Sequence, residues 1–469
     1  MLIHSSFRLL FHLLFLLMSL ASPKCLAQET SSSSTAQAPP SKPDEAAVPF
    51  AFADFSWAPG NYGPSESKMA TKFFTPELRL DNVYHYEFSN PIDNTISGSS
   101  EVFRHQEFQS TQIGVGGDFN VDNVGFRFMT QFGLYSTTTP RNDASPSRGQ
   151  WQLDNAYRYI SEAYATYHID SMNGINIQTG IFMSYVGLWS YYNFDNWTYQ
   201  PSYVSSNTPW FFNGMRIQFF PSDKLKIEPW LINGWQSYGM FNSQPGLGLQ
   251  ILWRPTGSFS LLTNEYYGAD TLGNPDRKRL HSDNSIMVKY YDNPAATLGK
   301  AAFSLTVDAG CEQGGDVNCS GQYFVGFMAY NRIWLGHDHY GLTIGGGAIR
   351  NPGRYLVLMP PINGATAASG ASNADPANGP VYNYFSENPG DDFQAWDVQL
   401  TGDYMPTRNL TFRLEYNHRQ ANIPYFSGHG GVTPPKGNVG LPGSQAPNNW
   451  APDLTNSEDR VSAAMMIRL

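Results

Sequence analysis

The last ten residues of the chain, 460–469, follow a period of two. The odd positions from Val461 to Leu469 are all apolar, whereas the even positions begin with Arg460 and end with Arg468. Because successive side chains of a β-strand point to opposite faces, this pattern predicts a strand with one apolar face and one face that carries arginine at both ends. Such a strand fits a membrane barrel that contacts lipid outside and water inside.

Residues 123–135 repeat the pattern in a longer form. Phe126 and Phe128 face one way in this stretch, whereas Arg127 and Gln131 face the other. A closed barrel requires the last strand to pair with the first, because an open sheet edge is not tolerated in lipid. We therefore expect the terminal strand to complete a ring that begins near residue 73.

Sixteen strand candidates follow from this periodicity. They are 73–88, 109–120, 123–135, 157–169, 174–186, 211–220, 224–235, 247–254, 258–268, 283–291, 300–309, 322–335, 340–349, 392–405, 410–420 and 459–469. The connections alternate without exception between short turns, most of them rich in Gly, Pro, Asn or Asp, and long loops, and both termini fall on the short-turn side. This layout predicts an all-β fold: a transmembrane antiparallel up-and-down β-barrel of about 16 strands, with short periplasmic turns and long extracellular loops.

Composition agrees with one large barrel rather than several soluble domains. Of the 469 residues, 14% are aromatic and only 14% are charged, which favours strands joined by polar loops over helices. The formal net charge is -10, and no basic stripe of the kind that binds nucleic acid is present. We expect no nucleic-acid partner.

The N-terminal region divides into three parts ahead of a barrel that spans 71–469. Residues 1–27 resemble a signal peptide, with an apolar run and a small-x-small site before Gln28. A lipoprotein that uses Cys25 is the alternative, although Pro23-Lys24 fits it poorly. Residues 28–49 are rich in Ser, Ala and Pro and predict a disordered linker. Residues 50–70 carry five aromatic side chains and are expected at the barrel mouth or in the lumen.

Cys311 and Cys319 remain after the signal peptide is removed, and both lie in one predicted loop. In an exported protein this arrangement predicts a disulfide that closes the loop. We interpret it as a structural staple rather than a metal or redox site.

A barrel of about sixteen strands leaves an aqueous channel rather than a core filled by side chains. Strand parity predicts which polar side chains line it. An arginine or lysine on the lipid face at mid-depth would cost about 2–4 kcal/mol, so water in the lumen is the tolerable environment. Each residue could contact solute or pair with a neighbour and stiffen the wall, and we weight both interpretations equally. The predicted pore-lining residues are Arg127, Gln131, Arg216, Gln218, Lys226, Glu228, Arg254, Lys289, Arg332, Asp397, Arg413 and Glu415.

The predicted loop Leu188–Phe212 is packed with Trp and Tyr, and exposed aromatic side chains of this density seldom remain in water. One hypothesis is that it folds inward and narrows the pore, where it would offer stacking surfaces to sugars. The alternative places its first and last aromatics in the interfacial girdle and packs the rest on the rim. From the sequence we favour the rim.

No constellation of residues indicates catalysis or a cofactor. The His337 and His339 pair stands in a short turn with one acid between, whereas a structural zinc site needs about four ligands, so we interpret it as a solvated turn. Ser161, Glu162 and His168 share one strand without forming a nucleophile, base and orienting acid. We expect no catalytic, cofactor-binding or metal-binding residues.

Long runs within the chain resemble a known family. The runs GIFMSYVGLWSYYNFDNWTYQPSYVSSNTPWFFNG and KIEPWLINGWQSYG, with GDFNVDNVGFRFMTQFGLYSTTTPRNDASPSRGQW before them, are similar to the putative beta-barrel porin family 2, the OmpL-like group. The resemblance covers nearly the whole mature chain. It implies an outer-membrane barrel of diffusion-porin type without catalytic residues. The chain departs from the usual aromatic C-terminus of such barrels in ending at Leu469, which weakens the assembly signal slightly.

We expect an outer-membrane porin of a Gram-negative bacterium that forms a water-filled passive diffusion channel for small hydrophilic solutes. Its partners would be outer-membrane lipid, these solutes and further copies of the chain in a homo-oligomer. The alternative is a structural or adhesive barrel that acts through the long loops 350–391 and 421–458. An outer-membrane enzyme is disfavoured, because acids and histidines do not gather at one predicted rim.

Overall fold

The computed structural model describes residues 48–60, 69–99, 101–354, 374–375, 379–380, 392–433 and 452–469. The predicted signal peptide, most of the linker and part of the 50–70 segment lie outside these residues. So does much of the two long loops on which the adhesive alternative depends. Among the residues that the structure describes, no helix has the length and apolar character needed to cross a membrane.

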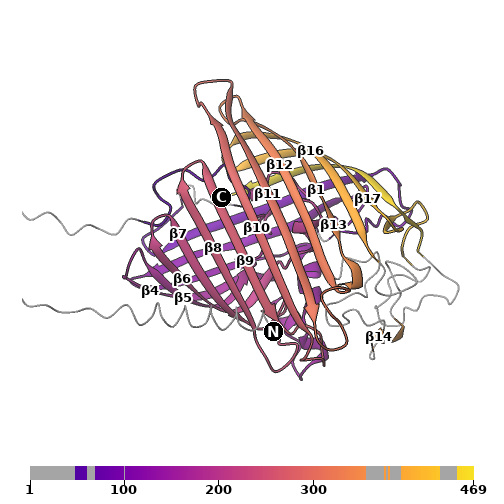
Figure 1. The fold of residues 1–469 in the computed structure, drawn as a ribbon. Helices are drawn as coiled ribbons and strands as arrows, with labels where there is room; N and C mark the ends of the chain where they lie inside the picture. Colours follow the sequence, from indigo (N-terminus) through magenta and orange to yellow (C-terminus); the bar gives the residue numbers. More distant parts are fainter. Residues whose placement is uncertain are drawn as a thin grey trace, which may run out of the picture. The chain divides into compact units, whose positions relative to one another are not determined.

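Sixteen antiparallel strands form a closed barrel, so the predicted fold is confirmed (Figure 1). Each strand pairs with the next barrel strand along the chain, as an up-and-down barrel requires. The strands are β1 (Phe74–Glu87), β2 (Phe108–Val121), β3 (Val124–Thr130), β4 (Ile160–Ile169), β5 (Ile175–Met183), β6 (Phe211–Ser222), β7 (Leu225–Ile232), β8 (Gly246–Thr256), β9 (Phe259–Gly268), β10 (Lys278–Asp292), β11 (Leu298–Gln313), β12 (Tyr323–Leu335), β13 (Tyr340–Arg350), β16 (Gln394–Thr407), β17 (Leu410–Ala421) and β20 (Ser457–Arg468).

The terminal strand closes the ring. β20 pairs with β17 on one side and with β1 on the other, in a register that sets Arg79 opposite Arg468 and Glu87 opposite Arg460. Every barrel strand therefore has two hydrogen-bonded neighbours, and no row of unpaired backbone groups faces lipid.

The two faces of the wall differ as the sequence period predicts. On β17, Phe412, Leu414 and Tyr416 are exposed on the outside, whereas Arg413 and Glu415 between them are buried inside. Apolar side chains can face hydrocarbon without losing hydrogen bonds, and charged ones find partners only in the lumen.

Aromatic side chains gather on the outer face near the short turns. Phe74 on β1 stacks on Phe119 of β2 with ring centroids 4.2 Å apart, and Tyr340 on β13 stacks on Tyr404 of β16 at 5.4 Å. Rings at this level correspond to the aromatic girdle that barrels place at the membrane–water interface. The short turns therefore mark one edge of the membrane-spanning band.

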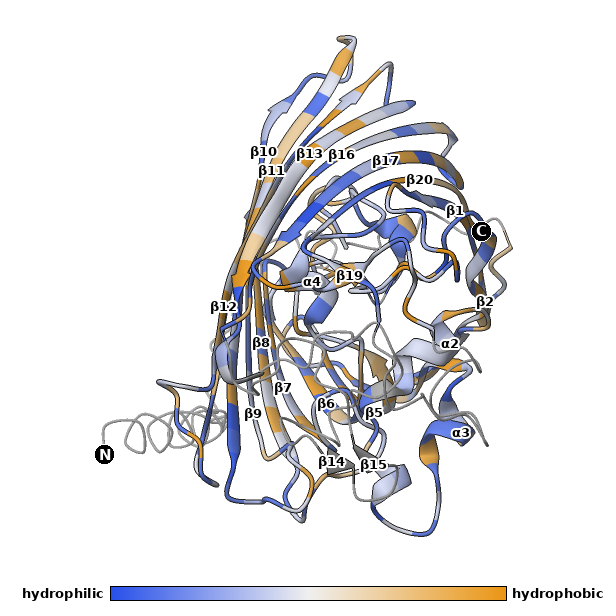
Figure 2. Cartoon of the chain, turned by 90° about the vertical axis from the view of Figure 1, so that its right-hand side faces the viewer, coloured by the Kyte–Doolittle hydropathy of each residue, from blue (hydrophilic) through white to orange (hydrophobic). Residues whose placement is uncertain are grey.

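Short elements occupy four of the long connections. They are α2 (Tyr135–Thr138), η1 (Thr139–Asn142), η2 (Ser145–Ser147) and α3 (Leu153–Tyr157) after β3, η3 (Asn193–Asp195) and α4 (Tyr203–Asn207) after β5, η4 (Pro352–Arg354), β14 (Ala374–Asp375) and β15 (Gly379–Pro380) after β13, and β18 (Phe426–Ser427) and β19 (Leu454–Thr455) after β17. Figure 2 shows α4 inside the ring of strands.

Several strand boundaries differ from prediction, and those of β3, β10 and β11 have physical reasons. β3 ends at Thr130 rather than near 135, because Gly133 adopts a positive φ of 102° where a Cβ would lie 2.5 Å from the carbonyl oxygen of Ser110. β10 and β11 begin and end several residues beyond the predicted limits, since their pairing continues through polar residues from Lys278 to Gln313. The hydropathy pattern does not predict that these polar residues belong to paired strands.

Cys311 lies in β11 and Cys319 in the loop that follows, with Cα atoms 5.0 Å apart and a disulfide between them. The bridge joins the end of a long strand to the loop beyond it. It lies at the long-loop end of the barrel, away from the short turns.

The largest apolar cluster lies within the ring of strands rather than on its outer face. It joins Trp57 of the N-terminal segment, Trp197 and Tyr203 of the β5–β6 connection, and wall residues such as Trp230 and Tyr330. A wide barrel whose interior is filled in this way has a lumen that is narrowed by its own chain.

Candidate channel constriction

All twelve predicted pore-lining residues face the inside of the barrel. Each is buried or half-buried, and each stands on a barrel strand except Gln131, which directly follows β3. They do not form one continuous polar lining. The structure gathers them into separate groups, each with its own acidic or loop partners, and their contact with solute remains a prediction.

One group surrounds Arg127 on β3. Its guanidinium contacts carboxylates from three neighbouring strands: Glu77 of β1 at 3.0 Å, Glu162 of β4 at 2.8 Å and Asp118 of β2 at 2.9 Å. Contact with three carboxylates covers the positive charge of this guanidinium. For Arg127, pairing is therefore the geometry that the structure describes.

A second group lies on β6 and β7. Glu228 accepts hydrogen bonds from Gln218 at 2.6 Å and from Lys226 at 3.0 Å. Arg216 lies beside them, with its guanidinium carbon 5.1 Å from the ring centroid of Trp230. These four predicted residues form one patch of wall, in which Glu228 accepts from Gln218 and Lys226 and lies 3.9 Å from the guanidinium of Arg216.

A third group anchors the connection between β5 and β6. The guanidinium of Arg413 on β17 donates to the carbonyl oxygens of Asn193 at 3.1 Å, Asn196 at 2.7 Å and Thr198 at 2.7 Å. It also pairs with Asp403 at 2.7 Å. One arginine on β17 thus holds three carbonyl groups of a loop that starts at the end of β5.

Further anchors fix the same loop along its length. Glu415 accepts hydrogen bonds from the backbone N–H groups of Tyr199 at 2.6 Å and Gln200 at 3.0 Å. Asp195 of the loop pairs with Arg79 at 2.9 Å and Arg468 at 2.7 Å. Charge-assisted hydrogen bonds are roughly twice as strong as neutral ones, so they fix the path of an irregular segment well.

We call residues 184–210 the lumen loop, because these contacts carry it across the inside of the barrel. The rim placement favoured from the sequence is therefore wrong, and the loop folds inward as the other hypothesis expected, whereas its contact with sugars stays a prediction. Its aromatics pack on inner wall residues: Trp189 lies 4.6 Å from Tyr330 and Trp197 lies 5.7 Å from Trp334, measured between ring centroids. Full burial of a large apolar side chain stabilises a folded protein by about 1.5–3 kcal/mol, so each buried ring helps to hold the loop inside.

The N-terminal segment 48–60 also lies against the wall and the lumen loop. Trp57 is 1% exposed, and its indole N–H donates to the carbonyl oxygen of Gly257 at 3.1 Å. The guanidinium carbon of Arg254 lies 4.2 Å from the ring centroid of Phe55. Lys289 places its ammonium 5.8 Å from the ring centroid of Trp57. Arg254 and Lys289, both predicted to line the pore, therefore meet this segment.

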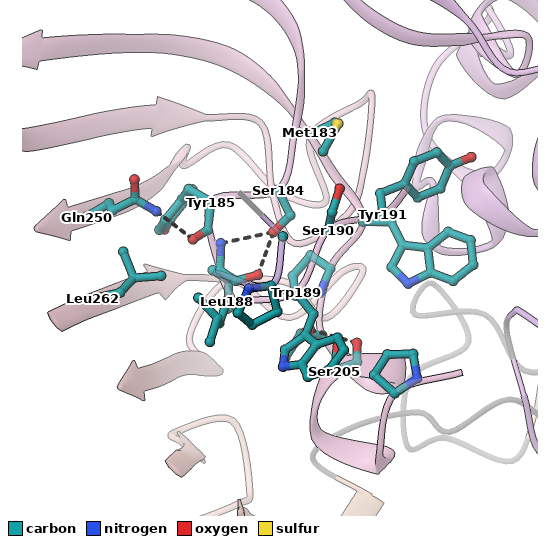
Figure 3. A pocket seen from close by; sticks show the side chains of 18 of the residues that line it. Met183, Ser184, Tyr185, Leu188, Trp189, Ser190, Tyr191, Ser205, Gln250 and Leu262 are labelled. Atoms are coloured by element: carbon teal, nitrogen blue, oxygen red, sulfur yellow. Dashed lines mark hydrogen bonds between the residues drawn. The ribbon is translucent and has the colours of Figure 1, made fainter. Parts of the chain in front are cut away.

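Two cavities flank the lumen loop. The smaller, of about 210 Å³, lies between the loop and the inner faces of β8, β9 and β10. Figure 3 shows aromatic and hydroxyl side chains around it, drawn mainly from the loop itself. Its lining includes Tyr185, Trp189, Ser190, Tyr191, Ser205 and Gln250.

The larger cavity, of about 690 Å³, lies toward the short turns. Its lining mixes bases and acids, among them Lys300, Arg332, Arg468 and Asp338. Lys300 pairs with Asp338 at 2.6 Å, and Arg332 pairs with Asp403 at 2.7 Å. A lining of mixed sign sets transverse fields rather than one net charge, so it selects for polar solutes.

Loops at the other end of the barrel interlock. The carboxylate of Asp93 in the first loop accepts hydrogen bonds from the backbone N–H groups of Val432 at 2.8 Å and Thr433 at 2.7 Å in the last loop. Burial by itself raises the pKa of Asp93, but these hydrogen bonds, with those from Thr95 and the Thr433 hydroxyl, bring the pKa below its ordinary value. The ionised carboxylate thus ties the two loops together.

Sequence reasoning missed several residues of this constriction. Tyr330 shares strand parity with Arg332, which was the signal that could have identified it. Its hydroxyl accepts a hydrogen bond from the Ser202 N–H at 2.8 Å and donates to Gln399 at 2.7 Å. Asp195 carried no comparable signal, because its partners Arg79 and Arg468 lie far away in the sequence.

Of the polar motifs considered above, Ser161 and Glu162 contact the hydroxyl group of Tyr192 in the lumen loop, each at 3.0 Å, whereas the histidine pair makes its hydrogen bonds in the short turns. His337 contacts the carbonyl oxygen of Pro294 at 3.2 Å and His339 that of Met405 at 3.0 Å, both in exposed short turns. Within the described part of the chain, no three His, Cys, Asp or Glu side chains are grouped as metal ligands.

A family profile agrees with this geometry. The profile described as Putative beta-barrel porin-2, OmpL-like, matches residues 75–441, from the second residue of β1 into the last loop. The chain belongs to this porin family. Membership places the porin among the channels of the outer membrane rather than among enzymes, and makes it a diffusion channel.

Solved structures resemble the porin at low identity. An anion-selective porin from Comamonas acidovorans is 8% identical with a TM-score of 0.46, covering 84% of this chain and 99% of that one. The outer-membrane channel DcaP of Acinetobacter baumannii is 12% identical with a TM-score of 0.46, covering 84% and 97%. OmpT of Vibrio cholerae, expressed in the outer membrane, is 9% identical with a TM-score of 0.45, covering 84% and 97%. No curated protein matches the chain.

Proposed function

We propose that this porin is a narrow diffusion channel whose lumen loop, residues 184–210, sets the size limit for small hydrophilic solutes. The observation that carries the proposal is the set of charged anchors on the far wall. Arg413 and Glu415 together hold five backbone groups of the loop. A loop held only by apolar contacts would be free to swing to the rim, whereas this one is fixed across the pore.

The solute class follows from the two cavities. Aromatic rings, hydroxyl groups and an amide surround the smaller cavity, and paired charges of both signs surround the larger one. Aromatic faces with nearby hydroxyl and amide groups suit small polar molecules such as monosaccharides, which stack and hydrogen-bond at once. A cavity of about 210 Å³ supports an upper size near one sugar ring.

A loop replacement tests the constriction. The lumen-loop residues 189–206 are replaced by a short Gly–Ser linker, and single-channel conductance is recorded in planar bilayers. We expect the conductance to rise, because the loop no longer fills the lumen. The matched control places the same linker at 146–152, an exposed stretch of the β3–β4 connection, and should leave conductance unchanged. Equal conductance in both variants and the native porin would contradict the proposal.

The remaining expectations about export and assembly are also proposals. Residues 1–27 would direct export to the outer membrane and be removed, and N-terminal sequencing of the mature protein tests this by locating its first residue. We propose that any oligomer of the porin is built from identical copies, because most soluble oligomers are symmetric homo-oligomers. Its test is the mass of the detergent-solubilised protein measured by native mass spectrometry.

A further inference from the structure

The N-terminal segment 48–60 reaches the barrel interior from the short-turn end. The N–H of Phe50 donates to the carbonyl oxygen of Asp223 at 2.7 Å, and the indole N–H of Trp57 donates to that of Gly257 at 3.1 Å. Asp223 lies in the turn between β6 and β7, and Gly257 lies in the turn between β8 and β9. These two hydrogen bonds tie the segment to the periplasmic edge of the wall.

The far end of the same segment meets the lumen loop. The indole N–H of Trp197 donates to the carbonyl oxygen of Trp57 at 3.0 Å, and the N–H of Gly60 donates to that of Asp195 at 3.0 Å. A Cβ on Gly60 would lie 2.1 Å from the carbonyl oxygen of Leu188. The two backbones are therefore in direct contact, with no space between them for a solute.

Two cationic side chains of the wall make cation–π contacts with aromatic rings of the segment. Arg254 lies over Phe55 at 4.2 Å and over Phe50 at 5.2 Å, and Lys289 lies over Trp57 at 5.8 Å. Cation–π contacts of this kind hold a ring in place and also cover the charge. The segment therefore covers the positive charges of Arg254 and Lys289 on the wall.

The segment forms part of both cavities. Pro59 and Gly60 line the smaller one, whereas Asp54, Ser56 and Trp57 line the larger one. Trp57, which lines the larger cavity, is only 1% exposed, so its indole is tightly packed two residues before the part of the segment that lines the smaller one. A passage that ran from one cavity to the other would have to cross the position of this segment.

We propose that residues 48–60 are a stopper, which closes the passage between the two lumen cavities and opens the channel when it withdraws toward the short turns. Trp57 is its anchor. The inference rests on the proposed function, since a stopper matters only in a channel. It adds a gate that responds to the N-terminal segment and is separate from the size limit set by the lumen loop.

Deletion of residues 48–60 tests the stopper. Full-length and deleted proteins are refolded, their folding is checked by heat-dependent gel mobility, and single channels are recorded in planar bilayers. We expect the deleted protein to stay open longer and its single-channel conductance to be at least roughly twofold higher, because the two cavities then join. Trp57→Ala should show part of this effect. Val48→Ala, at a residue 70% exposed in the same segment, should show none.

A synthetic peptide of residues 48–60 gives a second readout. Added to the deleted channel from the short-turn side, it should cause brief blocks, and the same peptide carrying Trp57→Ala should cause far fewer. If the full-length protein conducts and the deletion changes neither conductance nor open time, the stopper is overturned and the diffusion channel stands. If neither folded protein conducts, the stopper and the proposed function are both overturned.

Discussion

Replacing Arg413 by methionine isolates the anchor of the lumen loop. Methionine keeps an unbranched, apolar side chain of similar reach on β17 but cannot donate hydrogen bonds. Arg413 is 4% exposed and donates to three loop carbonyl oxygens as well as to Asp403. The substitution therefore acts on the loop and leaves the outer face of the barrel unaltered.

The size of the effect follows from those contacts. Hydrogen bonds from a charged donor contribute about 1.5–3 kcal/mol each, which would give roughly 4–9 kcal/mol for three if they were additive. Removal of one partner from a buried ion pair costs about 3–5 kcal/mol. That cost falls within the wall, where Asp403 keeps Arg332 as a partner at 2.7 Å. For the loop itself we take about 3 kcal/mol, below the additive sum of its three hydrogen bonds, because such contributions are not additive. A loss of about 3 kcal/mol shifts the loop toward release by roughly 100-fold.

Single-channel recording of Arg413→Met measures this release. We expect higher mean conductance and frequent fluctuations between levels, as residues 193–198 leave the lumen and return. The control is Arg350→Met, where an exposed arginine at the outer end of β13 pairs with Asp392 at 2.7 Å. Solvent-exposed ion pairs contribute little to stability, so this variant should behave like the native porin. A folded Arg413→Met channel with native conductance and native noise would refute the reasoning.

Three further predictions address other parts of the molecule. Reduction of the Cys311–Cys319 disulfide should speed proteolysis of the β11–β12 loop without altering conductance, because the bridge restrains a loop outside the lumen. An unchanged rate of cleavage would show that the bridge does not restrain this loop. The contact of Asp93 with the last loop should persist above the ordinary aspartate pKa of about 4 and weaken as the pH falls below it, since a carboxylate with a lowered pKa stabilises only while ionised. Hydrogen exchange at Val432 should report this loss, and Asp93→Asn should remove the pH step. Gly346→Val should prevent closure between β13 and β16, because φ is +153° and a Cβ would lie 2.1 Å from the carbonyl oxygen of Asp397; a heat-modifiable, folded band on a gel would contradict this.

The wall could be predicted from the sequence because lipid imposes one rule on every strand. Any residue that faces hydrocarbon must do without hydrogen bonds, so Phe412 and Leu414 alternate with Arg413 and Glu415 throughout β17. The same rule placed all twelve predicted lining residues on the inner face. It says nothing about what those side chains meet once inside.

The path of the lumen loop could not be predicted in this way. Burial of Trp189 and Trp197 on the rim or in the lumen would remove similar apolar area from water, so composition does not decide between them. The deciding contacts join Asp195 to Arg468 and Tyr199 to Glu415, across more than 200 residues of sequence. Backbone carbonyl and N–H groups supply most of these contacts, and every residue carries them whatever its side chain.

Liposome swelling in isosmotic solutions of neutral solutes of graded size tests the central claim most directly. We predict that refolded full-length porin admits monosaccharides and excludes larger oligosaccharides, because the lumen loop narrows a sixteen-stranded barrel to passages beside cavities of about 210 and 690 Å³. Equal entry of large and small solutes would contradict the constriction. Failure of every solute to enter vesicles that contain the folded barrel, both with and without residues 48–60, would contradict the channel itself.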